Sequence, residues 1–186
     1  VTSPAVFARQ IELLRADGYT AITLSEAVRL LEASDGGPMR GAPKVVITFD
    51  DGFRDFGTEA FPVLEDAGFK ATVFLPSAFI GKPFITGREC LSASEVRMLA
   101  DKGTEFGSHS VSHRRLVELS AKELGAELRD SKAAIEDVVG RAVTIGVFAD
   151  ANAVTSAIAA LELVGVVQRF ADPKASAFIP VHGEWL

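Results

Sequence analysis

The chain has 186 residues, of which 48% are hydrophobic, and its formal net charge is −6 with an isoelectric point near 5.1. This length and apolar content suffice for one sizeable core, so we expect a single domain over residues 1–186. The acidic balance, with lysine and arginine scattered along the chain, argues against a nucleic-acid partner. No apolar run approaches the roughly 20 residues that a membrane-spanning helix needs.

The chain start and the cysteine content leave the cellular compartment open. No basic and apolar signal sequence opens the chain, but the first residue is Val1 rather than methionine, so this absence decides nothing about export. Cys90 is the single cysteine, which excludes an internal disulfide framework and a cysteine-rich zinc site. We interpret it as a partly buried small hydrophobic residue.

The first half of the chain alternates helix and strand signals. Ser3 and Pro4 supply an N-cap and a first-turn proline for a helix that Gly18 stops. Phe7 and Ile11 share one face of this helix, which is therefore expected to pack on a core. The elements predicted next are a breaker-rich loop over 35–43, a strand over 45–49, a helix around 59–67 that ends at Gly68, and a strand over 71–76.

Two capping boxes mark helices in the second half. Ser92 with Glu95, and Ser120 with Glu123, have the required spacing, and glycines at 103 and 140 are expected to end these helices. The later predictions are a short strand followed by a loop over 104–109, a strand over 142–148, a helix over 152–163, and strands over 166–170 and 177–181. This alternation predicts an α/β fold with a parallel sheet and crossover helices.

Chemically distinctive side chains follow two of the predicted strands. Asp50 and Asp51 end the strand in "VVITFDDGF", and His109 and His113, in "HSVSH", follow another. The carboxyl ends of parallel strands meet at one edge, where chemistry collects in alternating folds. Two imidazoles four residues apart on a helical turn can reach one metal ion, and a carboxylate would complete a set with open coordination positions. A bound dication would also stabilise two adjacent carboxylates that otherwise repel each other.

Each half of this pattern also has a simpler interpretation. Histidines four residues apart often occur by chance on a polar face, and adjacent aspartates are common in solvated turns and helix caps. The combination is more specific, because two of only three histidines lie at metal-ligand spacing while both carboxylates end another strand.

The segments "TFDDGF" (Thr48–Phe53) and "HSVSH" (His109–His113) resemble the first two signature motifs of the polysaccharide deacetylase family, the NodB-homology carbohydrate esterases of family 4. The similarity extends over roughly residues 7–140. It implies a distorted (β/α) barrel, often with seven strands, and metal-dependent removal of N-acetyl or O-acetyl groups from a carbohydrate. The implied substrate is an acetylated glycan, and the implied reaction class is hydrolysis of C–N bonds other than peptide bonds.

The resemblance also implies roles for individual residues. Asp50 would be the general base. Asp51, His109 and His113 would hold a divalent metal, with zinc preferred and cobalt, nickel or manganese as alternatives. His182 would be the general acid, although its "PVH" context matches the family motif poorly and a surface histidine after the last strand is the alternative. An extracellular or cell-envelope location is favoured by the resemblance alone.

The chain departs from the family pattern after Gly140. Members usually carry an aromatic and proline turn whose backbone helps to form the oxyanion hole, whereas here Ala149 passes directly to Asp150. Either the turn is deleted or a mobile loop is missing from the sequence, and we favour the second account. Two alternative functions therefore stay open: a catalytically impaired carbohydrate-binding homologue, and a related metal-dependent amide or imide hydrolase.

Overall fold

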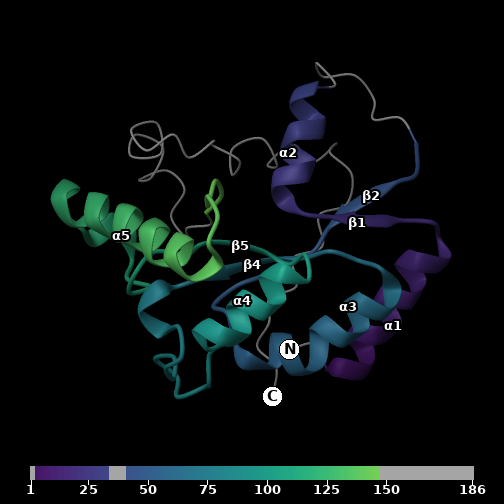
Figure 1. Cartoon of the computed structure of the whole chain (residues 1–186), viewed down its shortest axis with the longest axis horizontal. Helices are drawn as coiled ribbons and strands as arrows, with labels where there is room; N and C mark the ends of the chain where they lie inside the picture. The colour runs from purple at the N-terminus through teal and green to yellow at the C-terminus, as the bar shows by residue number, and fades with distance from the viewer. Residues whose placement is uncertain (1–2, 34–40, 147–186) are drawn as a thin grey trace.

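The computed structural model describes residues 3–33 and 41–146, in which parallel β-strands alternate with helices (Figure 1). β1 pairs with β2, while β3, β4 and β5 form a second sheet in that order, and every pair is parallel. The predicted α/β class is therefore confirmed. The strands are β1 (Thr20–Ile22), β2 (Lys44–Val46), β3 (Thr48–Phe49), β4 (Thr72–Leu75) and β5 (Glu105–Ser108).

Closure into a seven-stranded barrel stays a prediction. Of the strand predicted over 142–148, the described residues show only an isolated parallel bridge between Gly146 and Ser108, beside which the Ser108 amide donates to the Ile145 carbonyl at 3.0 Å. The helix predicted over 152–163 and the strands predicted over 166–170 and 177–181 lie outside the described residues. Closure therefore rests on the resemblance and not on the observed sheets.

Most helices between the strands begin and end at the predicted signals. Both capping boxes form, at Ser92 and Ser120, and Gly68 and Gly140 end their helices in the left-handed conformation. A π-helical turn (Phe56–Ala60), which the sequence does not predict, precedes α3. The helices are α1 (Pro4–Ala16), α2 (Leu24–Ala33), α3 (Phe61–Ala67), α4 (Ala93–Asp101) and α5 (Ala121–Val139), with 3-10 turns over Ser77–Phe79 and Leu116–Glu118.

Strand β1 and helix α2 are elements that the sequence reading does not predict. The start of α2 does carry a signal, because Thr23 and Glu26 have capping-box spacing. The Thr23 amide donates to the Glu26 carboxylate at 2.9 Å, and the Glu26 amide donates to the Thr23 hydroxyl at 3.3 Å. The same test that located α4 and α5 would therefore have located α2.

The single strand predicted over 45–49 is wrong in one respect, because the structure divides it at Ile47. β2, before the division, pairs with β1, and β3, after it, pairs with β4. The Ile47 carbonyl accepts from the Thr72 amide at 3.0 Å, so the chain stays extended while it changes partners. One continuous segment thus belongs to both sheets.

The core lies between the strands and the helices that cover them, and α1 and α3 lie side by side (Figure 1). Phe49 of β3 meets Phe7 of α1 and Phe56 of the π-helical turn in edge-to-face contacts, with ring centroids 5.8 and 4.8 Å away. Cys90 is 5% exposed, which confirms its reading as a buried small residue. Other fully buried side chains are Leu64, Val73, Phe74, Leu75, Leu91, Val96, Leu99, Leu128, Ile135 and Val143.

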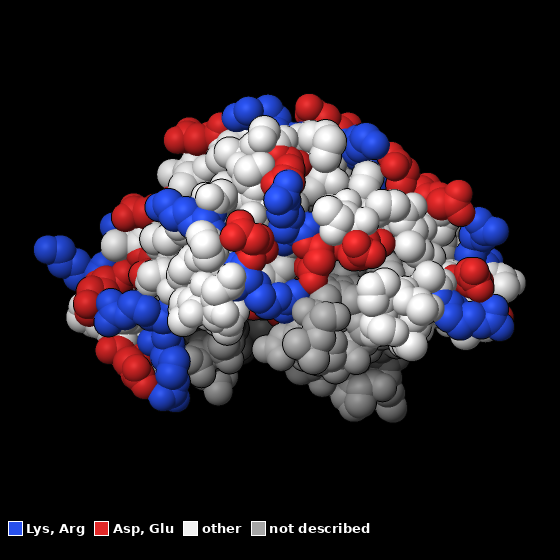
Figure 2. Space-filling model, turned by 90° about the horizontal axis from the view of Figure 1, so that it is seen from below, with Lys and Arg blue, Asp and Glu red and all other residues white. Residues whose placement is uncertain are grey.

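The charged surface is mixed. On the face seen in Figure 2, acidic and basic side chains alternate, and no broad area of one sign stands out among the coloured residues. Within residues 3–33 and 41–146, no helix combines the length and the apolar character needed to cross a bilayer.

Candidate metal centre

The turn after β3 directs the first candidate ligand. Asp51 has φ 66° and Gly52 has φ 61°, so two successive residues adopt the left-handed conformation directly after the strand. Aspartate tolerates this conformation better than most residues. Gly52 is required sterically as well, because a Cβ there would lie 2.2 Å from Cδ2 of Leu75. The "DDG" sequence therefore forms a tight turn directly after the strand.

An adjacent segment holds this turn in place. Residues 89–91 run antiparallel to it, with the Leu91 amide donating to the Gly52 carbonyl at 2.9 Å and the Arg54 amide donating to the Glu89 carbonyl at 2.9 Å. The Cys90 thiol lies 3.7 Å from the Asp51 carbonyl, to which it donates. Burial, reinforced by the nearby Asp51 charge, raises the pKa of the Cys90 thiol to about 11, so this group is a neutral donor at physiological pH.

The two histidines lie in a loop after β5, so the helical turn expected for them is wrong. Ser110 and His113 have φ 67° and 57°, which no right-handed helical turn contains. The backbone of this loop forms hydrogen bonds with the backbone of a neighbouring segment of the chain instead of within the loop. The Ser77 amide donates to the Ser110 carbonyl at 3.1 Å, and the Ala78 amide donates to the Val111 carbonyl at 2.9 Å.

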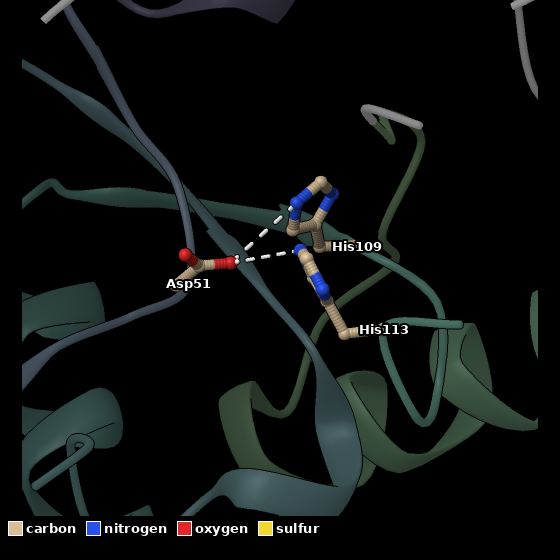
Figure 3. A group of neighbouring side chains, drawn as sticks. All are labelled: Asp51, His109 and His113. Carbon is tan, nitrogen blue, oxygen red and sulfur yellow. Dashed lines mark ion pairs between the residues drawn. The ribbon is translucent and has the colours of Figure 1, made fainter. Parts of the chain in front are cut away.

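The three expected ligands converge on one point. Oδ1 of Asp51 lies 3.6 Å from Nε2 of His109 and 3.2 Å from Nε2 of His113, and Figure 3 shows both rings turned toward that oxygen. The ring centroids are 4.8 Å apart, and one potential ligand atom from each residue lies within 4.8 Å of the others. His109 is buried, whereas the side chains of Asp51 and His113 are 21% and 34% exposed, so the cluster is buried on the His109 side and partly open to solvent on the other.

The donor set fits a divalent metal of the zinc type. Oδ1 of Asp51 is buried and has no hydrogen-bond partner, which is costly for a carboxylate oxygen unless a ligand completes it. Tetrahedral zinc with bonds of about 2.0–2.1 Å places its ligand atoms roughly 3.3 Å apart. The two Asp51–histidine separations, 3.2 and 3.6 Å, bracket that value. Two imidazoles and one carboxylate also match the ligand preferences of first-row metals.

The electrostatics of the cluster favour a positive charge. The close approach of the Asp51 carboxylate raises the pKa of His113 above its usual value, while burial acts in the opposite direction. The charge of Asp50 adds a smaller effect of the same sign on that pKa. A positive charge at this point is therefore favoured by the carboxylates around it.

Of the other two predicted site residues, Asp50 lies within the described part of the chain and His182 does not. Asp50 is partly buried and lies beside the cluster, at the end of β3. His182 lies outside the described residues, as does the junction between Ala149 and Asp150. Their roles therefore stay predictions.

Two residues near the cluster have no counterpart in the sequence reading. Phe84 packs edge-to-face on His113, with ring centroids 5.2 Å apart. Glu127 of α5 accepts three hydrogen bonds from residues between the histidines. Neither contact has a local sequence signal, because each joins segments that are distant in the chain.

Comparisons with known proteins agree with this site. A family model described as polysaccharide deacetylase matches residues 38–167. YxkH of Bacillus subtilis (strain 168), named as a candidate polysaccharide deacetylase, is 31% identical over 139 residues, which make up 75% of this chain and 47% of YxkH. This chain therefore spans about half the length of that curated relative.

Solved structures show the same fold. A polysaccharide deacetylase from Bacillus cereus is 27% identical with a TM-score of 0.61, and the match covers 77% of this chain and 42% of that one. The Streptococcus pyogenes deacetylase PplD, solved in complex with acetate, is 23% identical with a TM-score of 0.67, covering 76% of this chain and 60% of that one. Since the family model covers well over half of the sequence, the chain belongs to the polysaccharide deacetylase family.

Proposed function

We propose that this chain is the catalytic domain, over residues 1–186, of a metal-dependent deacetylase that hydrolyses acetyl groups, chiefly N-acetyl groups, on a carbohydrate. The observation that carries the proposal is the convergence of two histidine nitrogens on a buried Asp51 oxygen that has no hydrogen-bond partner. Family membership supports the choice of acetylated polysaccharide as the substrate class.

The roles of the residues follow from their chemistry. Asp51, His109 and His113 hold a divalent cation, with zinc preferred and cobalt, nickel or manganese as alternatives. When bound, such a cation polarises the acetyl carbonyl and lowers the pKa of a nearby water. The neutral form of His113 is needed to bind it, since a protonated imidazole has no lone pair to offer.

Asp50 acts as the general base in this proposal. Its carboxylate takes a proton from the water whose oxygen attacks the acetyl carbon. The C–N bond then breaks, a proton passes to the departing amine, and acetate leaves. We assign the donation of that proton to His182, as the family resemblance implies.

An acetate-release assay tests the proposed function. The substrates are N-acetylglucosamine oligomers, with the intact protein stripped of metal and then supplied with zinc or cobalt. We expect release that requires metal and falls by at least about 100-fold in Asp50→Asn, the order of a general base's contribution. His182→Ala should slow the reaction most for the substrate with the poorest leaving group. Metal-loaded wild type that releases no acetate from any acetylated sugar would contradict the proposal.

One observation favours a second candidate, a carbohydrate-binding homologue without activity. The sequence passes from Ala149 to Asp150 without the aromatic and proline turn that would complete the oxyanion side. This candidate predicts that the metal-loaded intact protein binds the same oligomers in calorimetry while releasing no acetate. The two assays on one preparation separate the candidates.

A further inference from the structure

Glu127 connects helix α5 to the loop that carries both histidines. Its carboxylate accepts from the Val111 amide at 2.7 Å, from the Ser112 amide at 2.8 Å and from the Ser112 hydroxyl at 2.5 Å. All three donors lie between His109 and His113. One side chain therefore receives every described hydrogen bond that the polar groups of residues 111 and 112 donate.

The loop needs such an acceptor because its own backbone offers no carbonyl to the amides of residues 111 and 112. The left-handed residues Ser110 and His113 exclude the pairing of a helical turn, so the amides of residues 111 and 112 point outward together. A carboxylate accepts strong, charge-assisted hydrogen bonds from both amides. Within the loop, the His113 amide is paired with the Ser110 hydroxyl at 3.1 Å. The spacing of the histidines thus depends on groups that are not ligands.

Helix α5 gives Glu127 a fixed position. One turn further along the helix, Ser131 is fully buried and accepts from the hydroxyl of Ser108 at 2.8 Å, and Ser108 directly precedes His109. Leu128 and Ile135 on the same helix are also fully buried. The helix is therefore held to the end of β5 at Ser108 and to the loop at Glu127. These two points lie on either side of His109.

We propose that Glu127 is a positioning residue that sets the separation of His109 and His113 and so determines metal affinity. The inference rests on the proposed metal-binding role of the two histidines. Glu127 does not contact the metal in this account; it acts through the backbone of residues 111 and 112. Neither of the family motifs contains it.

The test compares three variants of the intact protein. Glu127→Gln keeps the size of the side chain but presents one acceptor oxygen and one amide donor to a site that needs acceptors. Glu127→Asp keeps the charge on a shorter stem and serves as the conservative variant. Asp130→Asn removes the same charge from an exposed position of α5 and is the matched control. Zinc affinity is measured by competition with a chromophoric chelator, and the absorption spectrum of the cobalt form reports ligand geometry.

We expect Glu127→Gln to weaken zinc binding about 10- to 100-fold and to shift the cobalt spectrum, as loss of partners behind metal ligands does elsewhere. Glu127→Asp should recover part of the affinity, and Asp130→Asn should stay within about twofold of wild type, since it touches neither loop nor ligand. Amide exchange at residues 111 and 112 should accelerate in Glu127→Gln, while exchange in β4 stays unchanged.

Two results would overturn the inference. Wild-type zinc affinity in Glu127→Gln would show that the loop holds its histidines without the carboxylate. Faster exchange throughout β4 and β5, with an equal loss of affinity, would show a general structural role instead of positioning. Metal-binding wild type without acetate release contradicts only the proposed function. If wild type binds no zinc, unchanged exchange at residues 111 and 112 in Glu127→Gln still overturns the positioning role.

Discussion

The amino and carboxyl ends of the sheet formed by β3, β4 and β5 differ in whether their polar groups have hydrogen-bond partners. At the amino end, Thr72 and Glu105 are register partners, and the Thr72 hydroxyl accepts from the Leu24 amide at 3.0 Å while donating to Glu105 at 2.8 Å. At the carboxyl end of the same sheet, His109 directly follows β5, and Asp51 follows the neighbouring strand β3 with a carboxylate oxygen that has no hydrogen-bond partner. The protein itself pairs these polar groups at the amino end, whereas the Asp51 oxygen at the carboxyl end is free to bind a ligand.

A cavity makes the contrast more informative. The space of about 230 Å³ at the amino end is lined by Glu26, Lys70 and Glu105 among others. Its charged groups already have partners: the Lys70 ammonium donates to Glu26 at 2.5 Å, and Glu105 accepts from the Ser25 amide at 3.2 Å. The presence of a cavity would direct attention to this end, whereas the convergence of Asp51, His109 and His113 directs it to the other end. In this fold class the amino end usually serves stability and the carboxyl end serves chemistry.

The largest expected effect is on zinc affinity at the carboxyl end. Asp51→Asn should weaken zinc binding by more than about 100-fold, because even partners behind a ligand contribute 10- to 100-fold. At a pH where both histidines are neutral, the metal-free variant should be at least as stable as metal-free wild type, because the substitution removes a carboxylate oxygen that has no hydrogen-bond partner and asparagine tolerates the left-handed φ. Chelator competition and urea unfolding measure the two quantities. A destabilised variant that still bound zinc would reverse the comparison.

A second substitution tests the backbone at the carboxyl end. Gly52→Ala should lower the free energy of unfolding by about 2–5 kcal/mol, the sum of left-handed strain and overpacking against Leu75. Gly68→Ala is the matched control, because Gly68 has φ 69° but a Cβ there meets nothing within 4 Å. Only the strain, about 1–2 kcal/mol, should be seen in the control. Equal losses in urea titrations would refute the close approach of Leu75.

The corresponding change at the amino end is Thr72→Val. It leaves the buried Leu24 amide without an acceptor and removes a donor to Glu105, so we expect a loss of about 1–3 kcal/mol in the free energy of unfolding. Zinc affinity of the folded fraction should not change. A loss of zinc affinity without a loss of stability would show that the amino end contributes to the site.

The smallest expected effects are on pH dependence, and they also differ between the ends. In metal-free protein, the raised pKa of His113 stabilises the fold below pH 6.5, and this contribution is lost as pH rises through the folded-state pKa. For Glu26, burial raises the pKa, but the bonds and charge of Lys70 and Thr23 lower it further, so the net shift is downward. Its contribution is present above pH 4.5 and is lost as pH falls through the lowered pKa.

Urea unfolding of metal-free protein between about pH 3 and pH 9, the span around these two pKa values, measures both contributions. His113→Gln should flatten the profile above pH 6.5 only, and Glu26→Gln should flatten it below pH 4.5 only. A profile that His113→Gln leaves unchanged would show that the Asp51–His113 attraction is absent in solution.

The sequence was informative where structure is decided locally. Capping boxes at Ser92 and Ser120 located α4 and α5, and the strand ends located Asp51, His109 and His113 at one edge of the sheet. These features depend on a few neighbouring residues, so a local pattern suffices.

The rest depends on contacts between distant segments. A helical turn was expected for "HSVSH" because of its spacing, but bonds from Ser77, Ala78 and Glu127 hold this segment as a loop. The division of the strand at Ile47 likewise depends on which neighbour each half meets. Glu127 could not be found by spacing, since it lies 16 positions after Val111 and only the packing of α5 brings the two residues together.

The sharing of one segment between two sheets also limits how the sequence can change. β1 fixes the register of residues 44–46, and β4 fixes that of residues 48–49. Because both neighbours hold the segment, a one-residue deletion within 44–49 could not be absorbed by slippage on one side alone. The deletion would instead move each following residue back by one place, so that Asp51 would take the place of Asp50 and Gly52 the place of Asp51. Length variation should therefore be tolerated before residue 44 and rejected after it.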